Sequence, residues 1–140
     1  MTIVADSNLI IASVVKTHGF HARATAALAA PLQTGQLLIP QHVLFESFSV
    51  LTRGPAPLRA RPEVAYRLLQ LSYGSCRVIP TSVPDVWQFL RERDIRTAGG
   101  RLYDAVIAVA AIEAGAQRIM TFNPKHFETF ADSIEIVVPA

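Results

Sequence analysis

Short apolar runs separated by longer helical patterns are the feature that most constrains the fold of this chain. Strands are predicted at residues 2–5, 37–39, 77–79, 118–121 and 135–138. Helices are predicted at 7–15, 21–30, 41–53, 62–73, 84–93 and 101–114, with a helical turn near 124–127. Strands that alternate with helices favour parallel pairing, because the crossover helices cover both faces of the sheet. The pattern therefore predicts an α/β three-layer sandwich whose central parallel sheet has four to five short strands flanked by helices.

Proline and glycine mark several of the predicted boundaries. Pro31 is expected to end the second helix, and Pro62 to begin the fourth. Gly115 is expected to close the helix that begins at 101. A proline-rich break follows residue 53 and extends to about residue 61.

Length and composition narrow the class of protein. The 140 residues, of which 51% are hydrophobic, suit one domain spanning 1–140 and exclude a disordered chain. No apolar run approaches the ~20 residues of a membrane span, so we expect no membrane association. The only cysteine, Cys76, cannot form an internal disulfide, which fits a reducing cytoplasm. The net charge of +2 does not by itself indicate a nucleic-acid binder.

Three acidic residues are placed where a parallel α/β sheet binds its ligands, beyond the carboxyl ends of the strands. Asp6 directly follows the first strand, Glu46 shares a helical stripe with Val43 and Val50, and Asp104 lies in the first turn of a late helix. Each also has a purely structural interpretation. Asp6 suits a helix cap, Glu46 an ion pair with an arginine, and Asp104 compensation of a helix dipole.

Taken together, the three acids predict a divalent-metal site. Clustered carboxylates raise one another's pKa unless a cation neutralises them. Oxygen ligands without accompanying cysteine or histidine spacing favour Mg²⁺ or Mn²⁺ over Zn²⁺. Such an ion activates water and neutralises the charge that develops on a phosphodiester during hydrolysis.

An ordered set of motifs resembles that of PIN-domain ribonucleases, and among them the VapC-type toxins of type II toxin–antitoxin systems. The motifs are Asp6-Ser7-Asn8, Glu46, Tyr103-Asp104-Ala105 and Thr121-Phe122-Asn123, followed by Phe127. The resemblance implies a PIN-like fold and a Mg²⁺- or Mn²⁺-dependent RNA endonuclease that works by water attack. It also implies a homodimer and a cognate antitoxin whose tail occupies the site.

Carried over residue by residue, the resemblance makes Asp6, Glu46 and Asp104 the catalytic and metal-binding acids, with support from Asn8, Thr121 and Asn123. The chain departs from the family at Asn123, where many members have a fourth acid. Asparagine offers a neutral oxygen only, so we expect one tightly bound ion, with any second ion brought by the RNA.

Other polar and aromatic residues carry weaker indications. Arg101, Arg96 and Arg53 are candidates for contact with RNA phosphates, and Arg101 is the strongest because it lies one helical turn before Asp104. The histidines lack metal-ligand spacing and are expected to be structural or solvated. Tyr103 is expected to pack rather than to stack on a base.

Three alternatives to a toxin nuclease remain open. A phosphotransferase with Asp6 as nucleophile lacks the second acid expected two residues later, because Asn8 stands there. A PIN nuclease that processes RNA without being a toxin would use the same residues. A catalytically weak module that binds RNA or protein would fit the missing fourth acid. If an antitoxin exists, we expect it near the helices at 41–53 and 62–73.

Overall fold

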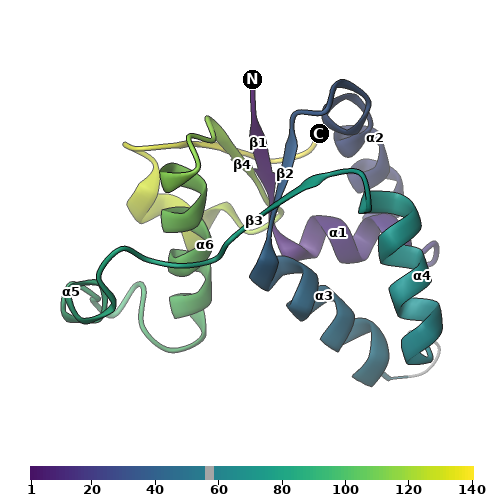
Figure 1. Ribbon diagram of the computed structural model, residues 1–140, viewed down its shortest axis with the longest axis horizontal. Coiled ribbons are helices and arrows are strands. Elements are labelled where there is room, and N and C mark those ends of the chain that lie inside the picture. The colour runs from purple at the N-terminus through teal and green to yellow at the C-terminus, as the bar shows by residue number, and fades with distance from the viewer. Residues whose placement is uncertain (56–58) are drawn as a thin grey trace.

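A five-stranded parallel sheet forms the centre of the molecule (Figure 1). The structure is a computed structural model that describes residues 1–55 and 59–140. The strands are β1 (Ile3–Ala5), β2 (Leu37–Pro40), β3 (Arg77–Ile79), β4 (Arg118–Met120) and β5 (Glu135–Val137). They are ordered β3-β2-β1-β4-β5, so that β1 pairs with both β2 and β4. This order brings the carboxyl ends of the three central strands to one edge.

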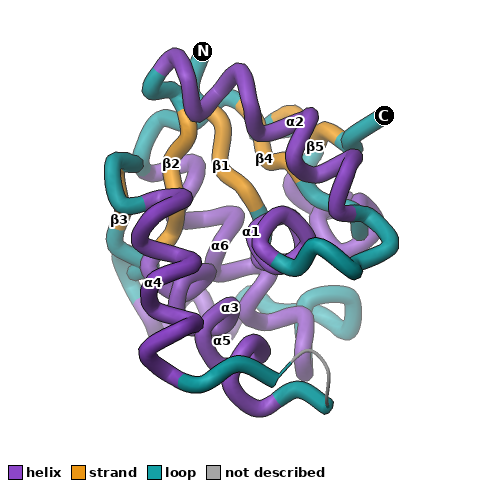
Figure 2. Tube along the Cα trace, turned by 90° about the vertical axis from the view of Figure 1, so that its right-hand side faces the viewer, coloured by secondary structure: helices purple, strands orange, loops and turns teal. Residues whose placement is uncertain are grey.

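Helices cover both faces of the sheet, so the predicted three-layer sandwich is confirmed. One face carries α1 (Ser7–Val14), α2 (His21–Thr34), α3 (Gln41–Arg53) and α4 (Pro62–Tyr73). Figure 2 shows α2 in front of the strands and α3 below them. The other carries α5 (Val86–Arg91), α6 (Leu102–Glu113) and the 3₁₀ segments η1 (Gly99–Arg101) and η2 (Pro124–Phe130). Among the described residues, no helix is both long and apolar enough to cross a lipid bilayer.

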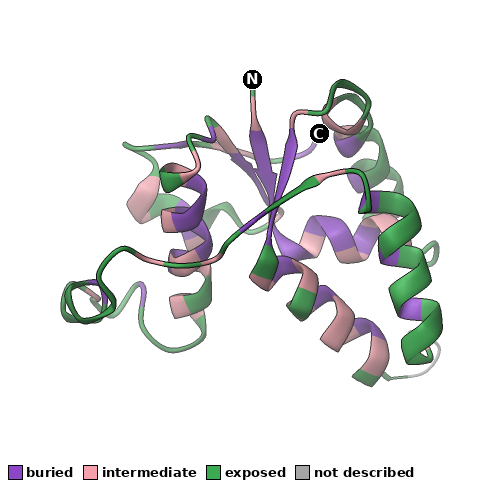
Figure 3. Cartoon of the chain, in the orientation of Figure 1, coloured by how far each residue is buried: buried purple, intermediate pink, exposed green. Residues whose placement is uncertain are grey.

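The core lies between the central strands and the helices on either side (Figure 3). Val4, Ile39 and Ile119 of the three central strands are fully buried, as expected for strands covered on both faces. α6 packs through Ala105, Ala108 and Ala111, and these small side chains let a helix approach its neighbours closely.

Two helices differ from the predicted boundaries by more than one residue at an end. α2 continues through Pro31 to Thr34, because a proline near the end of a helix removes only one hydrogen bond; the helix instead ends at Gly35, whose φ is 71°. α5 is shorter than the predicted 84–93, because Asp85 caps it by accepting a hydrogen bond from the Gln88 N–H at 3.0 Å. Part of the predicted proline-rich break at 54–61 lies outside the described residues.

Candidate active site

Asp6 is the buried acid at the centre of the site. It follows β1 directly and caps α1, with only 4% of its surface exposed. Its Oδ1 accepts a hydrogen bond from the Ser7 N–H at 2.8 Å, and its Oδ2 accepts one from the Thr121 hydroxyl at 2.8 Å. The predicted helix cap and the predicted site residue are therefore the same side chain, held in one orientation by two donors.

Thr121, which follows β4, connects the other supporting residues to Asp6. Its buried hydroxyl accepts hydrogen bonds from the Asn8 side-chain amide at 3.3 Å and the Asn123 N–H at 3.0 Å. The Asn8 Oδ1 also accepts a hydrogen bond from the Phe122 N–H at 3.3 Å. Asn8 and Asn123 thus hold Thr121, and Asn123 does so through its backbone while its side chain is exposed.

Asp104 lies in the first turn of α6 and contacts a histidine. Its Oδ2 lies 2.9 Å from Nδ1 of His126, which belongs to η2. About one fifth of the Asp104 side chain is exposed, so the carboxylate borders solvent while one of its oxygens is held. His126 therefore belongs to the site, although its spacing gave no metal-ligand signal.

Glu46 is more exposed than its sequence pattern suggested. The buried residues of α3 are Val43, Ser47 and Leu51, whereas the Glu46 side chain is 42% exposed. Its neighbour is Nε2 of His42, one turn earlier on the same helix, at 3.7 Å. The argument that Glu46 is a buried carboxylate is wrong, and the described part of the chain gives it no arginine partner.

Burial and neighbouring charges raise the pKa of two of the three carboxylates. Burial raises the pKa of Asp6 from 3.8 to about 6; the charges of Asp104 and Glu46 add to the rise, and hydrogen bonds from Thr121 and Ser7 oppose it. Burial also raises the pKa of Asp104, which the Glu46 charge reinforces and His126 and Arg101 oppose. The charges of Asp104 and Glu46 are thus near enough to Asp6, which follows β1, to raise its pKa.

The donor chemistry of this region fits a hard divalent ion, although the acids do not form a tight cage. In residues 1–55 and 59–140, no three Asp, Glu, His or Cys side chains come close enough to form a metal-binding group. Mg²⁺ commonly uses one or two carboxylates and keeps several waters, so a three-ligand cage is not required.

The three arginines expected to contact phosphate are placed differently. Arg101, in η1, is near enough to Asp104 to lower its pKa. Arg96 forms an ion pair with Asp94 at 3.0 Å. Arg53 lies at the end of α3, two helical turns beyond Glu46 and so about 10 Å along the helix. The structure brings only Arg101 close to the acids.

An open cavity of about 370 Å³ adjoins two of the acids. Its lining comes from α3, η1 and α6: His42, Phe45, Glu46, Ser49, Gly100, Tyr103 and Asp104. The rings of His42 and Tyr103 stack nearly parallel, with centroids 4.8 Å apart and an angle of 8° between the planes. The prediction that Tyr103 is mainly a packing residue is wrong, because 55% of its surface is exposed.

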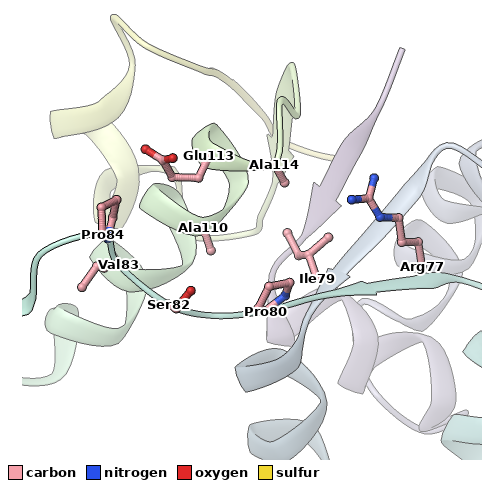
Figure 4. Close-up of a pocket in the computed structure, with 9 residues that line it drawn as sticks. All are labelled: Arg77, Ile79, Pro80, Ser82, Val83, Pro84, Ala110, Glu113 and Ala114. Carbon is pink, nitrogen blue, oxygen red and sulfur yellow. The ribbon is translucent and has the colours of Figure 1, made fainter.

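Two further cavities lie outside the acidic site. One, of about 300 Å³, lies between β3, the segment after it and the end of α6, with Arg77 and Glu113 among its lining residues (Figure 4). Another, of about 490 Å³, is an apolar groove between α3 and α4. Neither contains any of the predicted site residues.

His126 and His42 are the site residues that sequence reasoning missed. The signal for His42 was its position four residues before Glu46 on a predicted helix, a spacing that places side chains together. His126 follows Asn123 by three residues in the turn after β4, at the sheet edge where the acids were expected. Both signals were positional and did not resemble a metal-ligand motif.

Comparisons with known proteins agree with this architecture. A PIN domain is recognised over residues 3–132. Ribonuclease VapC27 of Mycobacterium tuberculosis is 30% identical over 140 residues, covering 99% of this chain and 97% of the relative. Two crystal structures share the fold at lower identity. VapC20 of M. tuberculosis has a TM-score of 0.63 and 22% identity, covering 84% of this chain and 87% of that one. VapBC2 of Rickettsia felis has a TM-score of 0.70 and 18% identity over the full length of both chains.

The domain match spans most of the chain, and the curated relative covers nearly all of it. Strands β1 to β4 lie within the matched residues, as do the buried Asp6 after β1 and Thr121 after β4. The chain belongs to the PIN-domain family and is a VapC-type member of it.

Proposed function

We propose that the chain is a Mg²⁺- or Mn²⁺-dependent endoribonuclease, the toxin of a toxin–antitoxin pair, that hydrolyses RNA phosphodiesters at a site formed by Asp6, Glu46 and Asp104. The observation that carries the proposal is the buried, hydrogen-bonded Asp6 at the sheet edge of a PIN domain, whose pKa the charges of Asp104 and Glu46 help to raise, with Glu46 and Asp104 lining one cavity. The relatives support it, since VapC27 is named a ribonuclease and VapC20 a sarcin–ricin loop cleaving toxin.

Asp6 and Asp104 would hold the metal ion, with Glu46 adding negative charge beside them. A bound Mg²⁺ or Mn²⁺ would offset the carboxylate charge, make water more acidic and polarise the phosphodiester. Both ions suit a donor set made of carboxylate oxygens.

The chain's own residues preorganise this site. Ser7 and Thr121 hold both oxygens of Asp6, and His126 holds one oxygen of Asp104, so neither carboxylate has to reorient when RNA arrives. Arg101 provides a cation near Asp104 that can contact a phosphate of the substrate.

A cleavage assay tests the proposal. The purified chain is incubated with a panel of RNAs, with Mg²⁺, with Mn²⁺ and with EDTA, beside Asp6→Asn and Asp104→Asn. We expect cleavage only with metal, and a loss of at least about hundredfold in either variant. Asp94→Asn is the matched control, because Asp94 is an exposed acid paired with Arg96 outside the site. Cleavage that persists in EDTA, or in both site variants, would overturn the proposal.

The same variants separate the nuclease from the alternatives. A module that only binds RNA would lose little affinity when a carboxylate is neutralised. A phosphotransferase with Asp6 as nucleophile is disfavoured, because Asn8 stands where such an enzyme is expected to have a second acid. A PIN nuclease without an antitoxin would cleave RNA equally well but lack an inhibitory partner.

The proposed partner is a cognate antitoxin that binds the apolar groove between α3 and α4. The Rickettsia felis structure is a VapBC complex bound to promoter DNA, which supports an antitoxin as the partner class. The groove is lined mainly by apolar and aromatic side chains, among them Leu44, Phe48 and Leu69. Leu71, beside it on α4, is 75% exposed. Co-expression with the antitoxin should suppress RNA cleavage, and Phe48→Asp should prevent this suppression.

We also propose that the chain forms a homodimer and acts in the cytoplasm, where a toxin would meet the RNA of its own cell. Light scattering over a range of concentrations tests the dimer. Cell fractionation tests the location.

A further inference from the structure

Exposed aromatic rings lie directly beside the acidic site. Phe45 and Tyr103 line the cavity that Glu46 and Asp104 also line, and they are 64% and 55% exposed. The His42 ring stacks on one face of the Tyr103 ring and so fixes the orientation of that ring beside the cavity. A large aromatic side chain that is left exposed loses the free energy that its burial would provide, which marks this surface as a candidate for binding.

We infer that this cavity binds a nucleobase of single-stranded RNA, next to the phosphate that is cleaved. The inference rests on the proposed ribonuclease function and names a part of the substrate that this function leaves open. The ligand is an unpaired base, because only a base that is free of its partner strand can place its face against protein rings.

The position of the rings relative to the acids supports this assignment. Tyr103 directly precedes Asp104 in the first turn of α6, so a phosphate near Asp104 would have its neighbouring nucleoside within reach of the cavity. Arg101, three residues before Asp104, is near enough for its charge to act on that carboxylate. Ring, acid and cation thus occur within four consecutive residues.

The cavity also has room for a base. Its volume of about 370 Å³ falls in the range of small-molecule sites. Gly100 forms part of the wall, and a Cβ added there would meet no atom within 4 Å. On one side of the cavity a base would meet aromatic rings. Because every base has a face that can stack on a ring, we expect the site to accept different bases.

Binding of a short RNA to an inactive protein tests the inference. The probe is a fluorescein-labelled ten-nucleotide oligouridylate, compared with an abasic oligomer of the same length, and affinity is measured by fluorescence anisotropy. In an Asp6→Asn background, we expect Tyr103→Ala to weaken oligouridylate binding by about five- to hundredfold. Tyr103→Phe, which keeps the ring, should bind like the parent. The abasic oligomer should bind the Asp6→Asn parent and its Tyr103→Ala variant equally.

Trp87→Ala is the matched control, because Trp87 is an 80% exposed aromatic residue on α5 that borders none of the three cavities. Circular dichroism checks that each variant is folded. If Tyr103→Ala weakens binding of the abasic oligomer as much as that of oligouridylate, or leaves both unchanged, the base site is overturned. Cleavage by the unaltered chain is measured in parallel, so that its absence identifies a failure of the proposed function rather than of the base site alone.

Discussion

The contacts of the Thr121 hydroxyl fix the direction in which its proton points. A hydroxyl has one donor and two acceptor positions. Two of its contacts are with N–H donors, from Asn8 and Asn123, so its own proton must point to the Asp6 carboxylate. This arrangement favours the ionised form of Asp6 and fixes its orientation, and it joins segments separated by more than 100 residues.

Thr121→Val should therefore destabilise the chain. The substitution removes three hydrogen bonds and leaves an oxygen of the buried Asp6 carboxylate and two partly buried N–H donors without this partner, so we expect the free energy of unfolding to fall by about 1–3 kcal/mol. The measurement is urea denaturation at constant pH. Thr129→Val is the control, because the Thr129 hydroxyl oxygen is buried and has no hydrogen-bond partner among the described residues. That variant should be as stable as the parent or more stable, and equal losses in the two variants would contradict the prediction.

Individual site residues differ in how far the sequence could identify them. Asp6 and Thr121 follow strands directly, and the chain leaves little freedom in where such residues lie. The exposure of Glu46 depends on how α3 is rotated about its axis, which is set by packing that no local pattern records. His126 contacts Asp104 through η2, whose path depends on the packing of Phe127 into the core.

At the scale of elements, local chemistry determines most helix ends. α3 and α4 begin and end at the predicted residues, because prolines precede or open them and glycine follows each. α2 continues through Pro31, because the proline costs the helix only one hydrogen bond. The helix ends instead at Gly35, where the backbone takes up a positive φ. A helix end with one strong signal could therefore be predicted from the sequence. The choice between two possible ends, such as Pro31 and Gly35, could not.

The end of α6 gives a prediction of this kind. Gly115 follows α6 with a φ of 77°, and a Cβ there would meet no atom within 4 Å, so only backbone strain opposes a side chain. Gly115→Ala should lower the free energy of unfolding by about 1–2 kcal/mol. Gly19→Ala, at an equally open glycine that does not have a positive φ, should be neutral or stabilising by less than about 1 kcal/mol. Thermal denaturation of both variants measures the difference, and a Gly115 variant as stable as the Gly19 variant would refute the strain argument.

At the scale of the whole molecule, the topology explains why distant acids meet. Parallel strands place all their carboxyl ends at one edge, so Asp6 and Thr121 had to be neighbours once β1 paired with β4. The sheet and its two helical layers could be predicted from the alternation of strands and helices along the sequence alone. The spacing between the acids was not, because it depends on how α3 and α6 pack against the sheet from opposite faces.

The burial of Asp6, reinforced by the charges of Asp104 and Glu46, makes the stability of the metal-free chain depend on pH. The pKa of Asp6 rises from 3.8 to about 6 on folding, so between these values the folded chain binds more protons than the unfolded chain. The free energy of unfolding must then fall as pH rises from about 4 to above 6. The expected loss from Asp6 is about 3 kcal/mol, because each pKa unit corresponds to about 1.4 kcal/mol. The raised pKa of Asp104 acts in the same direction.

Denaturation of the chain and of Asp6→Asn in EDTA, from pH 4 to pH 8, isolates this contribution. Asparagine does not ionise, so the variant should gain stability relative to the parent as pH rises, by up to about 3 kcal/mol. A bound divalent cation stabilises the ionised carboxylate, so Mg²⁺ or Mn²⁺ should stabilise the parent more at pH 7.5 than at pH 5 and should have little effect on the variant. A stability difference between the two proteins that stays constant across this pH range would mean that Asp6 keeps an ordinary pKa in the folded chain. The inference that the three carboxylates share one region of the molecule would then lose its electrostatic support.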